Sequence, residues 1–192
     1  MQPGKFAQFA HVGTWSAGEL CSGCGGSSEK LIPPLQIEWE PGTENIGDFA
    51  WCYSTCCVVS DAARHFLEQS QFECSFEPVE VLKPTEKTRV KRVQYPYTGP
   101  KLHWLRPKIQ VPLIENLSGV SVKRKCPKCG ITRYDVKEKH YFFRKKELGQ
   151  TKMFRIQQFG SDAMYLSEAA TALLESQKFT GYKLVLVGEV VD

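Results

Sequence analysis

Alternation of apolar and polar residues marks several short stretches of this chain as strands. Residues 35–40 read LQIEWE, and Pro41-Gly42 forms a turn signal directly after them. Residues 48–51 predict an extended piece that runs into Val58-Val59, and residues 1–20 are expected to be rich in β-structure. Further strand or extended segments are predicted at residues 72–82, 109–114, 118–125, 131–136 and 154–159.

Two segments show helical spacing of apolar residues instead. Ser60 is a predicted N-cap, Asp61 follows in the first turn, and an apolar face continues through Leu67. Residues 165–179 (YLSEAATALLESQKF) align without a gap on residues 58–72 (VVSDAARHFLEQSQF), with six identities in fifteen positions at an offset of 107. Chance would give about one identity. A second helix capped by Ser167 is therefore predicted.

Two CxxCG turns repeat at nearly the same offset. They are Cys21-Ser-Gly-Cys24-Gly25 and Cys126-Pro-Lys-Cys129-Gly130, with first cysteines 105 positions apart. We interpret the chain as two copies of one unit: a CxxCG turn, strands, a Ser-capped helix and a final strand. The alternative is that Ser-acid-Ala-Ala is a common helix start and the alignment arose by chance.

These patterns predict an α+β fold in a single domain, residues 1–192, made of two related strand–helix–strand halves with a pseudo-two-fold axis. The first repeat spans residues 1–82 and the second spans residues 121–192. Between them, residues 83–120 are predicted to form a basic crossover arm rich in proline and aromatic residues. Residues 138–150 are charged and predict a loop.

The paired turns supply the ligands of a closed tetrahedral zinc site. We predict one structural Zn²⁺ per chain, held by Cys21, Cys24, Cys126 and Cys129. Ordinary zinc ribbons separate their cysteine pairs by about 15–20 residues, whereas 101 residues intervene here. A pseudo-two-fold arrangement would explain how the turns meet. Two separate sites with other ligands, or a degenerate pair, remain alternatives.

The remaining cysteines differ from the turn cysteines. At the offset of 107, Cys52, Cys56, Cys57 and Cys74 align with Phe159, Ala163, Met164 and Gly181. Small or apolar counterparts favour core cysteines, with a second metal site or a reactive thiol as the alternative. The histidines at 11, 65, 103 and 140 have no metal-spaced partner, and neither a recognisable nucleophile motif nor a phosphate-binding glycine loop occurs. We therefore expect no enzyme.

Charge divides the chain unevenly, although its net charge is only +4. The balance is −8 over residues 1–82, +15 over residues 83–155 and −3 over residues 156–192. A candidate binding surface combines bases with aromatics: Lys87, Arg89, Lys91, Arg92, Tyr95, Tyr97, Trp104, Arg106 and Lys108. Such a mixture can bind nucleic acid through phosphates and stacking, or a protein groove. Alternatively, it packs its aromatics on the core and complements the acidic flanks.

The chain has ordinary globular composition, with 42% hydrophobic and 24% charged residues. No apolar run approaches the about 20 residues of a membrane span, and the N-terminus lacks a secretory signal pattern. Eight cysteines without such a signal indicate thiols and metal ligands in a reducing compartment. We expect a cytoplasmic protein with no membrane partner.

The stretches CSGCG, CPKCG, IEWEPGTENIGDFAW and SEAATALLESQKFTGYKLVLVGEV together resemble the bacterial double-CxxCG motif family. This family is known especially from myxobacterial paralogues, and some members are classed as immunity proteins for swarming-inhibition (Sit) toxins. The resemblance covers most of the chain and is least diagnostic over residues 83–120. It implies zinc at the four turn cysteines and a protein-binding role, with a cognate toxin as partner. The alternative function is that of a zinc-ribbon-like nucleic-acid-binding protein.

Overall fold

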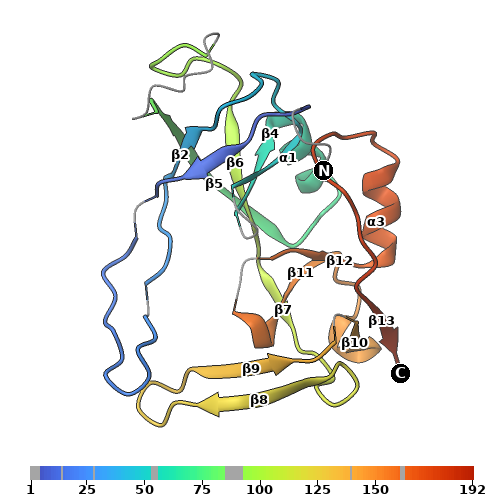
Figure 1. The fold of residues 1–192 in the computed structure, drawn as a ribbon. Coiled ribbons are helices and arrows are strands. Elements are labelled where there is room, and N and C mark those ends of the chain that lie inside the picture. The colour runs from blue at the N-terminus through green and yellow to red at the C-terminus, as the bar shows by residue number, and fades with distance from the viewer. Residues whose placement is uncertain are drawn as a thin grey trace.

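The computed structural model describes residues 5–13, 15–27, 29–52, 56–84, 93–138, 140–160 and 163–192. Within these ranges the fold is mixed α+β and mostly sheet, as the sequence predicted. Figure 1 shows the sheets in the body of the molecule and helix α3 on its outer side. None of the helices in these ranges is long and apolar enough to cross a membrane.

The largest sheet has the strand order β1-β2-β5-β6-β4-β3. Its members are β1 (Phe9–His11), β2 (Leu35–Trp39), β3 (Phe49–Cys52), β4 (Cys56–Ser60), β5 (Cys74–Leu82) and β6 (Leu102–Pro107). Strands β2 and β5 run parallel, and the other neighbours are antiparallel. In β2 the alternating pattern buries Leu35, Ile37 and Trp39, which is why this segment forms a strand with one face on the core.

Strand β6 lies within the segment predicted as a crossover arm, and its burial agrees with the alternative that this segment packs its aromatics on the core. Residues 102–107 lie between β5 and β4 in the interior of the sheet, and Trp104 is fully buried. The run Leu-His-Trp-Leu is apolar enough for a buried strand, and Nε2 of its single histidine, His103, lies 2.6 Å from Asp61 Oδ1. In the sequence, the neighbouring prolines and lysines made this short apolar run look like part of an exposed arm.

Helices α1 (Asp61–Gln69) and α3 (Glu168–Glu175) confirm both predicted N-caps. Ser60 Oγ accepts from the N–H of Ala63 at 3.2 Å, and Ser167 Oγ accepts from the N–H of Ala170 at 3.4 Å. The two caps have nearly the same backbone angles, with φ −69° and ψ 163° against φ −69° and ψ 161°. After each helix one residue has a left-handed backbone, at positions 71 (φ 55°) and 178 (φ 56°), again 107 apart.

Smaller sheets complete the fold. One has the order β12-β11-β7 and another pairs β10 with β13 in parallel. Their elements are β7 (Ile109–Val111), β10 (Tyr141–Arg144), α2 (Lys145–Leu148), β11 (Met153–Ile156), η1 (Gln157–Phe159), β12 (Tyr165–Leu166) and β13 (Gly188–Val191). The predicted loop at 138–150 is therefore wrong, because Phe143 and Leu148 turn inward from a short strand and helix between charged neighbours.

The two helices share one hydrophobic cluster, which contains Leu67 of α1 and Leu174 of α3. The cluster also joins β3 to the chain after α3, where the Phe49 N–H donates to the Thr180 carbonyl at 3.0 Å. A Cβ on Gly181 would lie 1.9 Å from the Phe49 carbonyl oxygen, and its φ is +87°, so this contact requires glycine.

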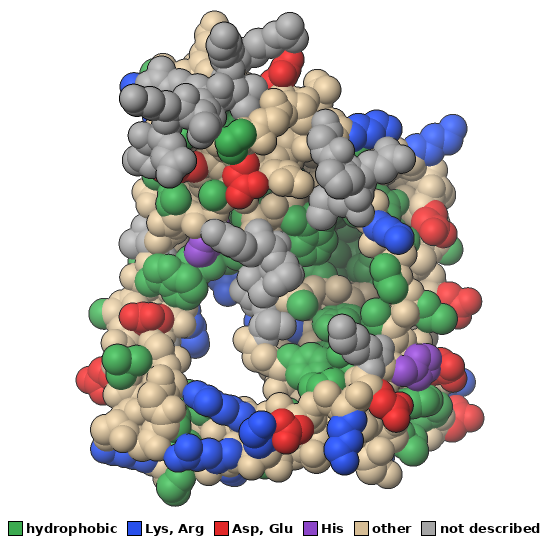
Figure 2. Space-filling model, viewed as in Figure 1, with side chains coloured by type: hydrophobic (Ala, Val, Ile, Leu, Met, Phe, Trp, Pro, Cys, Tyr) green, Lys and Arg blue, Asp and Glu red, His purple; other side chains and the backbone are tan. Residues whose placement is uncertain are grey.

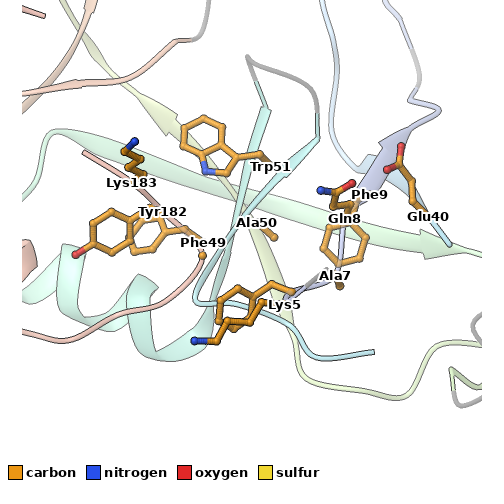
Figure 3. Close-up of a pocket in the computed structure, with 12 residues that line it drawn as sticks. Lys5, Ala7, Gln8, Phe9, Glu40, Phe49, Ala50, Trp51, Tyr182 and Lys183 are labelled. Carbon is orange, nitrogen blue, oxygen red and sulfur yellow. The ribbon is translucent and has the colours of Figure 1, made fainter. Parts of the chain in front are cut away.

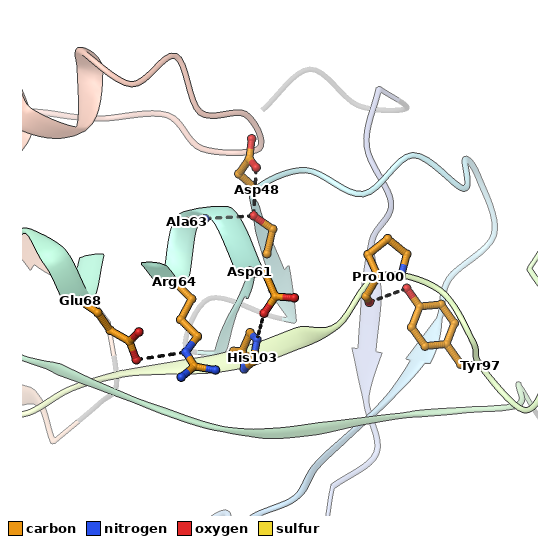
Figure 4. A network of polar contacts seen from close by, with 9 residues as sticks. Asp48, Asp61, Ala63, Arg64, Glu68, Tyr97, Pro100 and His103 are labelled. Carbon is orange, nitrogen blue, oxygen red and sulfur yellow. Dashed lines mark hydrogen bonds and ion pairs between the residues drawn. The ribbon is translucent and has the colours of Figure 1, made fainter. Parts of the chain in front are cut away.

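The Asp48 carboxylate links the same two regions. One oxygen accepts from Ser60 Oγ at 3.0 Å, and the other accepts from the N–H and hydroxyl of Thr180 at 3.0 and 2.8 Å. Figure 4 shows Asp48 above the first turn of α1, close to the cap contact with Ala63. The carboxylate therefore fixes the start of α1 and the end of the α3 unit together.

Outside the body, an N-terminal loop (residues 12–34) connects β1 to β2, and β8 (Val120–Lys125) pairs with β9 (Thr132–Val136) as a hairpin. The tips of the blue loop and the yellow hairpin meet in Figure 1. In the same view, Figure 2 shows an opening through the molecule between the loop, the hairpin and the body. The contact between the two tips therefore closes a ring formed by the loop, the hairpin and the body.

Candidate metal centre

The four turn cysteines come together where the loop meets the hairpin. Their sulfur atoms all lie within 4.8 Å of one another. Cys21 Sγ is 3.7 Å from Cys126 Sγ, and Cys24 Sγ is 3.6 Å from Cys129 Sγ. A tetrahedral centre with Zn–S bonds of about 2.3 Å requires S···S edges of about 3.8 Å. The four sulfurs therefore have the spacing to bind a metal ion.

The two turns share two backbone hydrogen bonds at equivalent positions. In the first, the Cys21 N–H donates to Gly26 at 2.8 Å and the Gly25 N–H donates to Cys21 at 2.7 Å. In the second, the corresponding bonds join Cys126 to Ile131 and Gly130 to Cys126, both at 2.9 Å. Gly25 and Gly130 have φ of +65° and +74°, a left-handed backbone that favours glycine.

Backbone amides face the sulfur atoms. The N–H groups of Gly23 and Gly26 donate to Cys21 Sγ and Cys24 Sγ, each at 3.4 Å. Backbone N–H groups of Cys129 and Lys128 lower the pKa of the Cys126 thiol well below its usual value. The thiolate is the form that binds metal, so these dipoles favour the binding-competent state.

Basic side chains of the hairpin reach the first turn. Arg124 donates to the Gly23 carbonyl at 3.0 Å, and Arg133 donates to the Cys24 carbonyl at 3.4 Å. Lys128 Nζ donates to Ser22 Oγ. Four thiolates around a divalent cation carry a net negative charge, which these cations offset. The two turns are thus joined by direct hydrogen bonds in addition to any shared metal.

The other cysteines have a different environment. Cys52, Cys56, Cys57 and Cys74 are all buried. Burial raises the pKa of Cys74 to about 12 and raises that of Cys57 well above its usual value. Within the described ranges, the four turn cysteines form the metal-binding cluster and these residues do not join it. The interpretation of core cysteines is confirmed.

The predicted binding surface is only partly placed. Lys87, Arg89, Lys91 and Arg92 lie outside the described residues. Tyr95 and Tyr97 are half-buried, and Lys108 is exposed. The Tyr97 hydroxyl donates to the Pro100 carbonyl at 3.0 Å, as Figure 4 shows. The assignment of Trp104 to a surface is wrong because this ring is buried, with the Arg106 guanidinium 4.5 Å from its centroid.

A different basic surface lies beside the metal centre. Figure 2 shows Lys and Arg side chains along the edge of the molecule that the β8–β9 hairpin forms. The exposed bases of this hairpin are Lys123, Arg124, Lys125, Lys128 and Arg133. The sequence reasoning missed them as a site, although the run VKRKCPK leads directly into the second turn.

Two of the cavities lined by described residues lie in the body. The first, of about 630 Å³, has aromatic walls, and Figure 3 shows Phe49 and Tyr182 side by side with Trp51 near them. Glu40 lies at its far side, away from Lys183 (Figure 3). The second, of about 780 Å³, lies between β12, α3 and the chain that leads into β13. Neither cavity was predicted from the sequence.

No protein-family model matches the chain, and a search of the curated proteins finds no match.

Proposed function

We propose that this protein is a zinc-stabilised protein-binding module without enzymatic activity, acting in the cytoplasm. The observation that carries the proposal is the cluster of four sulfur atoms contributed by turns 105 residues apart. A closed four-cysteine shell leaves no open position for water or substrate. The metal would therefore fix the position of the N-terminal loop against the hairpin, and we propose that this fixed structure serves to bind a partner.

Zinc suits this donor set. Soft thiolates in a tetrahedral arrangement select zinc or iron–sulfur centres, and sulfur separations of 3.6 and 3.7 Å match a single tetrahedral ion. One Zn²⁺ per chain would be held by Cys21, Cys24, Cys126 and Cys129. It supplies folding free energy to the N-terminal loop and the hairpin, and it takes no part in a reaction.

The two turns belong to two related halves, residues 1–82 and 121–192, arranged about a pseudo-two-fold axis. Support comes from the pairing register: Leu20 opposite Ser27 corresponds at the offset of 105 to Lys125 opposite Thr132. The matched caps of Ser60 and Ser167 give the same support at the offset of 107. In this arrangement the metal lies where the two equivalent CxxCG turns, one from each half, meet.

The partner we propose is a cognate bacterial toxin, which this protein neutralises by occupying its surface. The motif resemblance supports this assignment, and the basic β8–β9 hairpin offers a charged surface that would complement an acidic partner. The test is co-expression with a toxin encoded directly upstream. We expect a stable complex and rescue of growth. Unimpaired toxicity in the presence of the folded, zinc-loaded chain would contradict the assignment.

The same bases favour a second candidate, a nucleic-acid-binding protein. Lys123, Lys125 and Lys128 lie on one exposed hairpin and could contact phosphates. A gel-shift titration at increasing salt distinguishes the two functions. Nucleic-acid affinity that falls steeply with salt, without toxin neutralisation, would replace our proposal by this candidate.

A further inference from the structure

A strand fills the space between the two parallel strands that flank helix α1. Strands β4 and β5 are connected by α1, and β6 lies between them, antiparallel to both. Val58 of β4 lies opposite Trp104, and Phe76 of β5 lies opposite Leu105. Leu102, Trp104 and Leu105 of the inserted strand are all buried. This segment is therefore a strand-filled slot covered by a helix.

Helix α3 follows β12 and precedes β13 in the same order, but no described strand lies between them. At the offset of 107, residues 74–78, which pair with β6, correspond to residues 181–185. Those residues form no strand. Strand β12 is an edge of its sheet, and β13 is an edge of its own. The partner that β6 provides in the first half has no described counterpart in the second.

A cavity occupies the corresponding place. The space of about 780 Å³ is lined by Tyr165 and Leu166 of β12 and by residues 182–190, together with side chains of α3, β3, β10, α2 and β11. Leu186 is 84% exposed and Val185 is 67% exposed. Large apolar side chains exposed together around a hollow indicate an interaction surface. An unpaired edge also offers free backbone hydrogen-bonding groups.

We propose that this slot accepts an extended strand of the partner protein, which inserts between β12 and residues 181–187 and runs antiparallel to β12. The occupant is a short, largely apolar segment with bulky side chains, like the six residues of β6. Its backbone would complete the sheet by strand addition, and its side chains would fill the cavity. The inference rests on the proposed protein-binding function and adds a second contact surface to the basic hairpin.

The register of the first slot indicates which amides face the occupant. Pro78 lies opposite His103 and has no N–H, so the pairs that exchange hydrogen bonds are the alternate ones, at Ser75 and Glu77. Their counterparts at the offset of 107 are Tyr182 and Leu184. The Leu184 N–H should therefore point into the slot, and the Val185 N–H should point away.

The test uses the full, zinc-loaded chain and a fluorescent peptide with the sequence of residues 101–108 (KLHWLRPK), the segment that fills the first slot. We expect saturable binding by fluorescence anisotropy, and binding at least about tenfold weaker for a scrambled peptide. Leu186→Glu should remove peptide binding, since this exposed side chain borders the cavity. Leu117→Glu is the matched control, because Leu117 is an exposed leucine (49%) that does not line this cavity.

A second pair of variants tests the backbone. Leu184→Pro should abolish peptide binding, whereas Val185→Pro should retain it, with equal thermal melting of the two variants. Peptide binding that survives Leu186→Glu would overturn the proposal, as would a scrambled peptide that binds equally well. Dimerisation of the chain that Leu186→Glu abolishes would assign the slot to a second copy and would also overturn it.

The toxin assay separates the two proposals. If the toxin binds the wild-type chain and Leu186→Glu equally, the slot is not the contact surface, although the proposed function stands. If the peptide binds the slot and no toxin is neutralised, the slot stands and the proposed function fails.

Discussion

The two regions built around α1 and α3 share their local structure and differ in how their sheets are completed. Both helices are capped by serine and end before a left-handed residue. Around α1 the sheet is continuous through β6, whereas the strands beside α3 belong to separate small sheets. Local sequence thus repeats the helix and its caps, while completion of the sheet depends on a segment from elsewhere in the chain.

The largest expected effect concerns the metal turns, where the two regions should be equivalent. Structural zinc contributes about 10–16 kcal/mol of apparent binding free energy in small modules. Cys21→Ser and Cys126→Ser should each abolish metal binding and make the N-terminal loop sensitive to protease, because the sulfur cluster joins its tip to the hairpin. Metal analysis and limited proteolysis measure both effects.

Cys57→Ser is the matched control for these variants. It places a hydroxyl in the core, since Cys57 is buried, and should lower stability while the chain keeps its metal. Retention of one metal per chain by either turn variant would contradict a shared centre. Two metals per chain in the wild type would contradict it as well.

The core leucines of the two helices should differ in how much each contributes to stability. Leu67 is fully buried, and Leu174 is 3% exposed and borders the larger cavity. Leucine-to-alanine changes in cores cost about 2–5 kcal/mol, and the cost depends on how far the site can relax. The loss of unfolding free energy, measured in urea, should lie near the upper end of this range for Leu67→Ala and near its lower end for Leu174→Ala. Equal losses would show that the cavity gives α3 no freedom to relax.

The two serine N-caps should differ in their contribution to stability by less than the two core leucines do. Replacing an N-cap serine by alanine costs about 1 kcal/mol. Ser60→Ala should cost more than Ser167→Ala, because Ser60 also donates to Asp48 at 3.0 Å and its bond to the helix is the shorter one. Thermal unfolding of the single variants and of Ser60→Ala with Asp48→Ala measures the difference. If the excess at Ser60 persists in the Asp48→Ala background, the link to Asp48 is not its cause.

The sequence predicted the structural features that interactions between neighbouring residues determine. Serine caps, the CxxCG turns and the alternation in β2 depend on neighbouring residues, and all were found where expected. The central position of β6 was not predicted, because the burial of Trp104 depends on strands β4 and β5 that are distant in sequence. Conversely, residues 181–187 (GYKLVLV) are apolar and β-branched enough for a strand but form none, since β-structure requires a neighbour.

The smallest expected effect is a pH-dependent one at the start of α1. Asp61 Oδ1 lies 2.6 Å from Nε2 of buried His103 (Figure 4), and this hydrogen bond lowers the pKa of Asp61. A carboxyl whose pKa is lower in the folded state stabilises the fold above its unfolded pKa of about 4. That stability is lost as the pH falls through the lowered folded value. Asp61→Asn should therefore be less stable than wild type near neutral pH, and the gap should close in acid.

Glu168→Gln supplies the comparison at the equivalent position of α3. Both acids face a helix N-terminus and lose the same favourable interaction with its dipole when neutralised. Glu168 makes no side-chain hydrogen bond in the part of the chain that the structure describes. Urea unfolding of both variants from neutral pH down to about pH 3 should show a larger pH-dependent gap for Asp61→Asn. Equal gaps would mean that the helix dipole alone sets the effect and that His103 adds nothing to it.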